Sequence, residues 1–482
     1  MRHHPFTKLA SILVVCLMVF SSAAFADEAQ LMDMVKQMQK QMTELQTTVM
    51  AQKTEIQALK TGSGKIAMAP SGVEATPPMS EAEFNQRLSD STGGANKWLK
   101  DLKFSGDLRL RYEAFHLHGN TAANTYQPNR NRFRFRLRYG FEKTFSPEMK
   151  VGFSMASGSA TDPISTNQTL GGDFNFKNIF IEKAYATYTP EWAKIGPVSG
   201  FEVTAGKFNN PFEKGSTDMI FDRDLKPEGI YEKIDTKILD TENFDLKAYA
   251  LLGQFVLQES GNTGTKDANL FAYQAGLNPV FYVPGMERPV DALSALSVYN
   301  YQKFGELTNF ATYANGNPTF NATTLSAREF NVLSFYQEIN FYPYGIPVKP
   351  FAEFARNMSN RSGLAAATPG NSMQGGEYAW SLGLTLGKLQ KKKDWQASYQ
   401  YKWIGANSVP GAFNDSDFGG YNYGGADKSG SVIKLGYNLT DYLTLNGACY
   451  LVRPITQRNT ITNGMQADQS VRRFQLDMTY KF

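Results

Sequence analysis

The chain ends in Val471-Arg-Arg-Phe-Gln-Leu-Asp-Met-Thr-Tyr-Lys-Phe482, in which polar and apolar residues alternate without a break from Arg473 onward. A β-strand points successive side chains to opposite faces, so this stretch has one apolar face and one polar face. A membrane-spanning barrel strand requires this pattern over roughly 10 residues, with aromatic residues near its end. An edge strand of a soluble sandwich alternates in the same way, so this stretch alone leaves both folds open.

The amino terminus carries an export signal. Arg2 and Lys8 precede the apolar run Leu9–Phe20, and Ala24-Phe25-Ala26 follows as a small-x-small cleavage site. The sequence therefore predicts a signal peptide over residues 1–26. After residue 26 the sequence has no run of about 18 apolar residues, so it predicts no membrane-spanning helix. An exported chain that meets lipid without such a helix satisfies its backbone only in a closed barrel, so this terminus favours the barrel.

The composition excludes several classes of function. The chain has 49 Lys and Arg against 45 Asp and Glu, a near balance that argues against a nucleic-acid partner. Two of its four histidines, His3 and His4, lie in the signal. The mature chain keeps one cysteine, Cys449, and therefore has no internal disulfide. We expect no catalytic site, no metal site and no cofactor.

Residues 27–60 have a different, helical pattern. Apolar residues recur every seven positions in two registers, which predicts a coiled coil with an interruption at Gln52. Its core residues are Leu31, Val35, Met38, Met42, Leu45, Val49, Ile56 and Leu59. The residues at the a and d heptad positions favour a coiled coil of two helices and leave one of three helices open. A lone amphipathic helix is the alternative. Residues 61–101 are expected to form a linker, with room for a short helix after residue 80.

The rest of the chain, residues 102–482, is expected to form an all-β transmembrane barrel of about sixteen antiparallel strands. The clearest strand is 132–142, where Phe133, Phe135 and Leu137 alternate with arginines. We predict strands at 102–114, 132–142, 149–156, 176–189, 201–208, 229–238, 244–253, 269–277, 293–303, 330–341, 348–357, 377–388, 394–404, 430–439, 442–453 and 471–482.

The connections between these strands differ in length. Those after the second, tenth, twelfth and fourteenth strands are short, whereas 304–329 and 405–429 are examples of long polar loops. Short turns on one rim and long loops on the other are typical of outer-membrane barrels. With an even number of strands, both ends of the barrel lie on the short-turn rim. The coiled coil is therefore expected in the periplasm.

These features give the chain a family resemblance. It resembles the putative porin and phosphate-selective-porin-like families of Gram-negative outer membranes, in particular members with an N-terminal coiled coil. The resemblance rests on the Phe104–Tyr112 opening, Ala205-Gly-Lys-Phe-Asn-Asn-Pro-Phe212, Asp224-Leu-Lys-Pro-Glu-Gly-Ile230 and the terminal Phe482. It implies a sixteen-stranded homotrimeric barrel in the outer-membrane lipid, with the third long loop folded inwards. It also implies that the barrel-assembly machinery recognises Phe482. No lysine-rich entry loop is evident, so the charge pattern departs from that of the phosphate-selective members.

A sixteen-stranded barrel encloses an aqueous channel, whose narrowest part and wall charges set its selectivity. The expected pore-lining residues are Arg109, Arg111, Arg132, Arg134, Arg136 and Arg138. The third loop, 209–228, is the candidate constriction, with Glu213, Asp218, Asp222, Arg223, Asp224, Lys226 and Glu228. If this loop folds opposite the arginines, solutes cross between an acidic and a basic surface. The alternatives are arginines paired with carboxylates or lipopolysaccharide, and a loop that only caps the rim.

The leading hypothesis is a porin that lets small hydrophilic solutes and ions diffuse passively, with a mild anion preference. An enzyme built on a barrel is a second hypothesis, which the few histidines disfavour. A structural barrel is the third: its coiled coil would tether the envelope to peptidoglycan, or the barrel would surround an electron-transfer partner.

Overall fold

In the computed structural model of the chain, the described residues are 101–119, 129–261, 266–304, 307, 317, 330–359, 376–419, 425–455 and 469–482. The predicted signal peptide, coiled coil and linker lie outside these residues. Among the described residues, no helix has the length and apolar character needed to cross a membrane.

Sixteen long strands make up the wall of the barrel, and a two-residue strand, β4 (Gln168–Thr169), lies in one loop. The wall strands are β1 (Leu102–Gly119), β2 (Arg130–Ser146), β3 (Met149–Ser157), β5 (Ile179–Tyr188), β6 (Val198–Lys207), β7 (Glu228–Asp240), β8 (Phe244–Gln258), β9 (Ala268–Phe281), β10 (Val290–Gln302), β11 (Phe330–Asn340), β12 (Val348–Asn357), β13 (Tyr378–Gly387), β14 (Trp395–Ile404), β15 (Lys428–Asn438), β16 (Leu443–Pro454) and β17 (Gln469–Lys481). Short 3₁₀ turns lie at Glu191–Ala193, Pro211–Gly215 and Pro343–Gly345.

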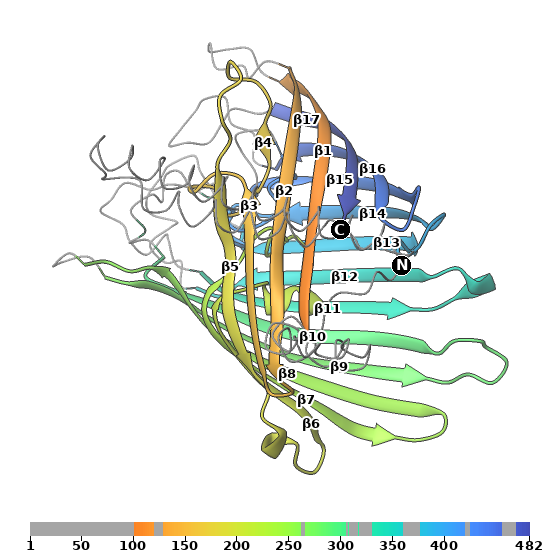
Figure 1. Ribbon diagram of the computed structural model, residues 1–482. Helices are drawn as coiled ribbons and strands as arrows, with labels where there is room; N and C mark the ends of the chain where they lie inside the picture. The colour runs from red at the N-terminus through yellow and green to blue at the C-terminus, as the bar shows by residue number, and fades with distance from the viewer. Residues whose placement is uncertain are drawn as a thin grey trace, which may run out of the picture. The chain divides into compact units, whose positions relative to one another are not determined.

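Each wall strand pairs antiparallel with its neighbours in the sequence, and β1 closes the barrel by pairing with both β2 and β17 (Figure 1). At the seam, the Gly106 N–H donates to the carbonyl of Phe482 at 2.8 Å, and the Phe482 N–H donates back at 3.1 Å. The closed antiparallel barrel of sixteen strands predicted from the sequence is confirmed. Closure leaves no unpaired edge strand along the seam.

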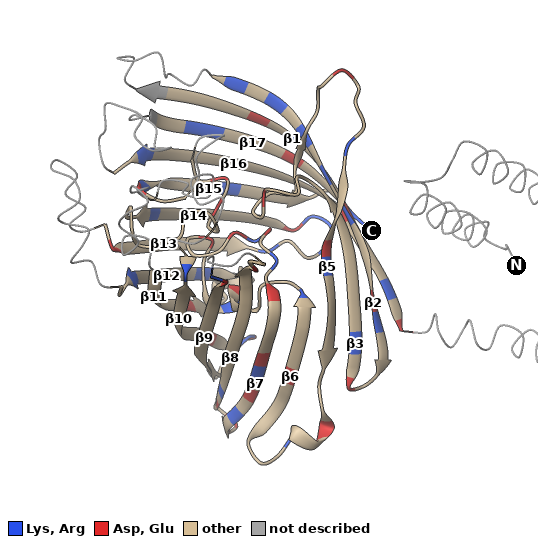
Figure 2. Ribbon diagram, turned by 90° about the vertical axis from the view of Figure 1, so that its left-hand side faces the viewer, with Lys and Arg blue, Asp and Glu red and all other residues tan. Residues whose placement is uncertain are grey.

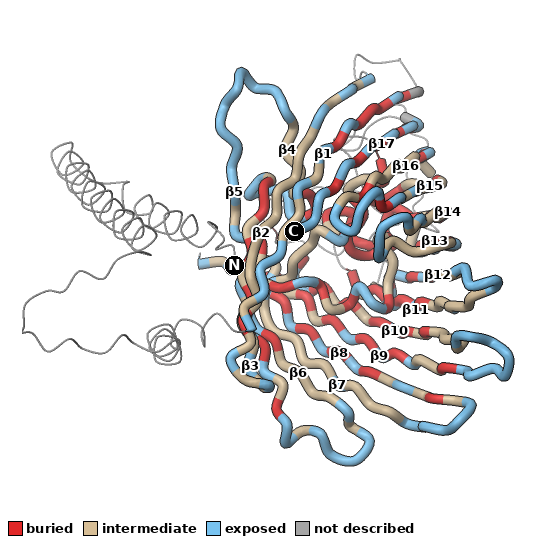
Figure 3. Tube along the Cα trace, turned by 45° about the vertical axis from the view of Figure 1, so that its right-hand side comes forward, coloured by how far each residue is buried: buried red, intermediate tan, exposed pale blue. Residues whose placement is uncertain are grey.

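The wall strands expose their apolar side chains and bury their polar ones. On β17, Leu476 is 60% exposed, whereas Gln475 and Asp477 are 5% and 8% exposed. Figure 3 shows buried and exposed positions alternating along the strands, with exposed residues at the turns. A soluble sheet has the reverse arrangement, because water favours exposed polar groups. This barrel therefore presents its apolar surface to lipid.

The connections on one rim have two to nine residues, and those on the other rim have nine or more. The short turns are 147–148, 189–197, 241–243, 282–289, 341–347, 388–394 and 439–442. The longer connections are 120–129, 158–178, 208–227, 259–267, 303–329, 358–377, 405–427 and 455–468. Because β1 begins and β17 ends on the short-turn side, both ends of the barrel lie at that rim.

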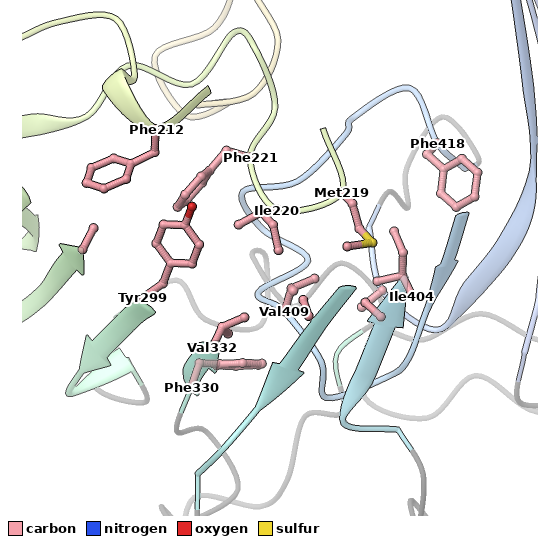
Figure 4. Packing of buried hydrophobic residues seen from close by; sticks show 14 of the residues in the cluster. Phe212, Met219, Ile220, Phe221, Tyr299, Phe330, Val332, Ile404, Val409 and Phe418 are labelled. Carbon is pink, nitrogen blue, oxygen red and sulfur yellow. The ribbon is translucent and has the colours of Figure 1, made fainter. Parts of the chain in front are cut away.

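Buried apolar residues form a cluster inside the barrel. The inner faces of β8, β9, β10 and β11 contribute Phe255, Leu270, Tyr299 and Val332, among others. Figure 4 shows residues of the long connections packed against this wall, among them Phe212, Ile220 and Val409. Part of the interior is therefore filled, and the remaining polar space is lined by residues of β11 to β17 together with β1 and β2.

Candidate functional site in the barrel lumen

Three neighbouring strands bring a dense set of charges to the inner wall. The register of β1 and β2 places Arg109 opposite Arg136 and Arg111 opposite Arg134. On the other side of β1, Arg111 lies opposite Asp477 of β17. Like charges directly opposite one another repel, so this register requires carboxylates nearby (Figure 2).

Glu113 of β1 is the centre of one ion-pair group. Its side chain is fully buried and accepts from the guanidinium groups of Arg132 and Arg473, while Arg134 lies 3.9 Å away. Gln475 donates a further hydrogen bond to the same carboxylate at 2.9 Å. A buried carboxylate surrounded by donors in this way is costly to leave unpaired, so the group holds β1, β2 and β17 together.

The remaining arginines of the wall also face carboxylates. Arg111 donates to Asp477 at 2.7 Å, and Arg136 lies 2.6 Å from Asp107. Arg109 lies 3.9 Å from Asp477. All six arginines predicted to line the pore therefore lie within ion-pair distance of an acidic residue, which is the arrangement that the sequence left open as an alternative.

The connection 208–227, which we call the β6–β7 loop, lies inside the barrel. Its residues Phe212, Met219, Ile220 and Phe221 are almost completely buried. The Phe212 and Phe221 rings each pack edge-on against Tyr299 of β10, with ring centroids 5.8 Å and 5.0 Å away (Figure 4). Burial of these apolar side chains stabilises the inward position, since each contributes on the order of 2 kcal/mol.

Polar contacts hold the same loop on the side of β9 and β12. Glu353 of β12, 2% exposed, accepts from the Thr217 backbone N–H at 2.8 Å and the Ser216 hydroxyl at 3.0 Å. Gln274 of β9 donates to the carbonyls of Phe212 and Gly215, both at 3.3 Å. These contacts satisfy backbone groups that would otherwise be buried without partners.

The far end of the β6–β7 loop reaches the arginine wall. Asp224 accepts from Arg138 at 2.8 Å, lies 3.8 Å from Arg136, and accepts from the Thr166 hydroxyl at 3.1 Å. Burial alone would raise the pKa of Asp224, but the guanidinium groups of Arg138 and Arg136 hold it below its ordinary value. Asp224 is therefore a carboxylate that neutralises the wall by direct contact.

A second connection, 405–427 or the β14–β15 loop, also folds inwards over its described residues 405–419. The sequence analysis did not predict this. Its Ser416 N–H donates to Asp222 at 2.8 Å, and its Asp415 N–H donates to the Asp218 carbonyl at 3.0 Å. Its Asp417 lies 3.2 Å from Arg111 and 2.6 Å from Arg473. The sequence feature that could have indicated this inward fold is the acidic run Asp415-Ser-Asp417 in the middle of a long loop.

Lys402 of β14 joins the two infolded loops. Its side chain is fully buried and lies 2.7 Å from Asp218 of one loop and 2.5 Å from Asp415 of the other. The Lys402 ammonium also lies 4.8 Å from the centre of the Phe418 ring. The Lys402 ammonium thus forms ion pairs with two carboxylates from different loops. The position of each loop therefore depends on the other.

The pKa of Asp222 is shifted in the opposite direction from that of Asp224. It is buried, and Asp224 and Asp415 lie close to it; burial and these two acids raise its pKa well above the ordinary value. Burial also raises the pKa of Asp415, despite the nearby Lys402. In contrast, Lys402 and Lys434 hold the pKa of Asp218 below its ordinary value, against the effect of burial.

A polar cavity of about 840 Å³ remains between the wall and the two infolded loops. Its basic lining residues are Arg109, Arg111, Arg136, Arg138, Lys214, Arg223, Lys349 and Lys434. Its acidic lining residues are Glu213, Asp218, Asp222, Asp224, Glu338, Asp415, Asp417 and Asp477. Eight bases face eight acids, so the lining carries both signs of charge with little excess of either. Among the described residues, no group of His, Cys, Asp and Glu is arranged to hold a metal ion.

The cavity lining includes most of the residues predicted for the site, but not all of them. Arg132 and Arg134 lie on the inner face, yet they are paired with Glu113 and do not line the cavity. The loop boundary needs a correction, because Glu228 is the first residue of β7. It pairs with Lys207 of β6, 2.5 Å away, which ends the loop one residue earlier than predicted. Lys226 lies in the loop and lines a neighbouring pocket instead.

The fold and this lumen define a class of protein: a closed transmembrane β-barrel with a polar interior narrowed by infolded loops. A family model described as putative porin matches residues 116–331 and 306–482, which is most of the chain. The chain belongs to this porin family, whose members are outer-membrane β-barrels. No curated protein matches the chain.

Solved porin structures resemble the chain over most of its length. The high-pH structure of OprB from Pseudomonas putida is 13% identical, covers 82% of this chain and 97% of its own, and gives a TM-score of 0.45. OmpF from Salmonella typhi, solved in complex with daunomycin, is 9% identical to this chain. The match covers 79% of this chain and 97% of OmpF, with a TM-score of 0.43. A trimer form of OmpT from Vibrio cholerae is 10% identical to this chain. The match covers 79% of this chain and 99% of OmpT, with a TM-score of 0.38. The fold assignment rests on the strand pairing described above.

Proposed function

We propose that the protein is a general-diffusion porin: a water-filled channel for passive movement of small hydrophilic solutes and ions, without enzymatic activity. The observation that carries the proposal is the polar cavity of about 840 Å³ between the arginine wall and the β6–β7 and β14–β15 loops. Charged and hydroxyl groups in such a lining replace part of the water shell of a passing solute, whereas apolar solutes gain no such contacts.

The selectivity that we propose is weak. Guanidinium groups are charged at any relevant pH and attract anions, which gives a mild anion preference. The acids that pair with them reduce this preference, because Asp224 and Asp477 lie within 4 Å of Arg136 and Arg109 respectively. Opposite charges around one space favour dipolar and charged solutes over apolar ones, with the β6–β7 loop as the proposed constriction.

The assembly and position of the protein are proposals as well. We propose a homotrimer in the outer membrane, which the trimer form of the structurally similar OmpT supports by analogy. The coiled coil of residues 27–60 would then lie in the periplasm. The barrel-assembly machinery would recognise Phe482 during insertion.

Single-channel recording in planar bilayers tests the channel. The expected result is a linear conductance in KCl, a small reversal potential under a salt gradient, and liposome swelling by neutral sugars that falls with sugar size. Purified, folded protein that inserts into bilayers without conducting would overturn the proposal. An assay of lipid hydrolysis on the same sample separates this function from that of an enzyme on a barrel.

A further inference from the structure

The outward face of the barrel carries a row of basic residues next to one another at the long-loop rim. On β17, the exposed outward side chains are apolar from Tyr480 to Phe474, and the next outward residue is Arg472. On β16, the exposed Leu451 is followed by Arg453. On β1, His116 takes the corresponding place, two residues beyond Ala114. All three basic side chains are exposed.

The strand register brings these residues together. His116 of β1 lies directly opposite Arg472 of β17, and Leu451 of β16 lies opposite the other side of Arg472. Arg453 is two residues beyond Leu451, which makes it a diagonal neighbour of Arg472 on the same face. Directly opposite and diagonal neighbours on one face lie within roughly 8 Å, so long side chains reach a common ligand.

The two arginines differ from those inside the barrel in having no carboxylate partner among the described residues. Each of the six arginines on the inner faces of β1 and β2 lies within 4 Å of a carboxylate. Arg453 and Arg472 form no ion pair or hydrogen bond with any residue of the described part of the chain. An unpaired guanidinium beside lipid is costly near the middle of a bilayer and is tolerated at its surface, where anions are present.

The height of the row on the barrel indicates which anion it meets. From Tyr480 to Arg472 the strand advances eight residues, roughly 26 Å along its axis and about 20 Å along the membrane normal after tilting, which is most of the height of an outer-membrane apolar band of about 25 Å. The row therefore lies where the apolar band ends and the lipid headgroups begin. Forked guanidinium groups bind phosphate oxygens in pairs, and a neighbouring imidazole adds a further donor.

We propose that Arg453, Arg472 and His116 form a site on the outside of the barrel for the phosphate of a phosphorylated lipid headgroup at the long-loop rim. The site is separate from the lumen and is independent of what the channel conducts.

The test is lipid titration of the detergent-solubilised full-length protein, read by native mass spectrometry, with bis-phosphorylated lipid A and its dephosphorylated form as probes. Replacement of both arginines, R453Q/R472Q, is expected to weaken binding of the phosphorylated lipid by about 25-fold, since each basic residue near a charged lipid surface contributes about fivefold. The dephosphorylated lipid is expected to bind the wild type and the double variant equally.

Arg356→Gln is the matched control. Arg356 is an exposed arginine on β12 at the same rim, and it lies over the Tyr378 ring at 5.1 Å, away from the row. Its loss is expected to leave lipid binding unchanged, and an equal loss would overturn the site. Full competition by inorganic phosphate at the same concentration as the lipid would assign the site to the free anion and overturn the lipid proposal. Dissociation of oligomers in R453Q/R472Q, with lipid binding unchanged, would make the row a contact between copies and also overturn it.

Discussion

Asp224 and Arg138 are 86 residues apart in the sequence, and their side chains lie 2.8 Å apart in the barrel lumen. The pair joins the β6–β7 loop to the arginine wall of β2. An acidic loop residue in contact with the arginine wall neutralises the charge of the arginines. An acidic loop residue on the opposite side of the water-filled lumen would instead create an electric field across the lumen. The first arrangement is present at Asp224, and it reduces the net charge that a passing ion meets.

Replacement of Asp224 by Asn is expected to increase anion preference. The change leaves Arg138 with Glu182 alone and removes a neighbouring carboxylate from Arg136. The reversal potential under a KCl gradient, measured in planar bilayers, should therefore shift in the direction of chloride selectivity. Glu228→Gln is the control, because Glu228 pairs with Lys207 outside this cavity. A shift of the same size in both variants would contradict this account.

Replacement of Arg136 by Ala is expected to shift the reversal potential towards cations. Arg136 lines the cavity, and its loss leaves Asp107 and Asp224 with fewer cationic partners. Arg134→Ala should shift the potential less, because Arg134 does not line the cavity. Both variants are measured under one salt gradient. An unchanged ion preference in R136A would mean that the wall does not set selectivity.

Replacement of Lys402 by Met is expected to loosen both infolded loops. The buried carboxylates of Asp218 and Asp415 would lose their shared cation, a change that costs about 3 kcal/mol for a buried pair. We expect a lower thermal unfolding midpoint and a larger, noisier single-channel conductance. Lys434→Met is the control, since Lys434 is partly exposed and lies 3.7 Å from Asp218. Equal destabilisation in the two variants would show that Lys402 has no special role.

Acid should weaken the attachment of the β14–β15 loop through Asp417. Burial would raise the pKa of this residue, but Arg473 and Arg111 lower it well below its ordinary value of 3.8. A lowered pKa contributes stability above the unfolded-state value near 3.8 and loses it as pH falls through the folded-state value. Asp417→Asn should therefore lower the unfolding midpoint at pH 7, and the difference from wild type should shrink below about pH 4. Thermal melts between pH 2 and pH 7 measure this. A constant difference across that range would rule out the proposed cause.

An arginine at Leu476 should destabilise the barrel in lipid. Leu476 is 60% exposed in the middle of the outward apolar row of β17. A charge on this face costs about 2–4 kcal/mol at mid-membrane depth. Gln396→Arg places the same side chain on the cavity wall, where water is available, and should cost much less. Unfolding in lipid vesicles by denaturant compares the two variants, and equal stability would contradict a lipid-facing β17.

The strands were predictable from the sequence because their signal is local. Alternation with a period of two identified most of the wall strands. It was weak for β5, because the two faces of residues 176–189 are similarly apolar, but a strand was still predicted there and residues 179–188 form it. The ends were less predictable, since β8 continues to Gln258, five residues past the expected end. Strands end where the neighbouring strand stops pairing, and that depends on the neighbour.

The interior was only partly predictable. Periodicity placed the arginines of β2 on the inner face, because the side-chain period of a strand is fixed. It did not show that Glu113 and Asp477 would pair with them, because those pairings depend on the register of β1 with β2 and β17. The inward fold of the β14–β15 loop depends on Lys402 and Arg473 from other parts of the chain, so no local pattern reports it.

Local sequence patterns were enough to predict a lipid-exposed sheet of about sixteen strands, since alternation and the terminal aromatic row are properties of neighbouring residues. The signal peptide remains a prediction. Which charges neutralise one another became clear from the folded barrel. Ion pairing depends on distances between groups that are tens to hundreds of residues apart, and closure of the barrel sets those distances.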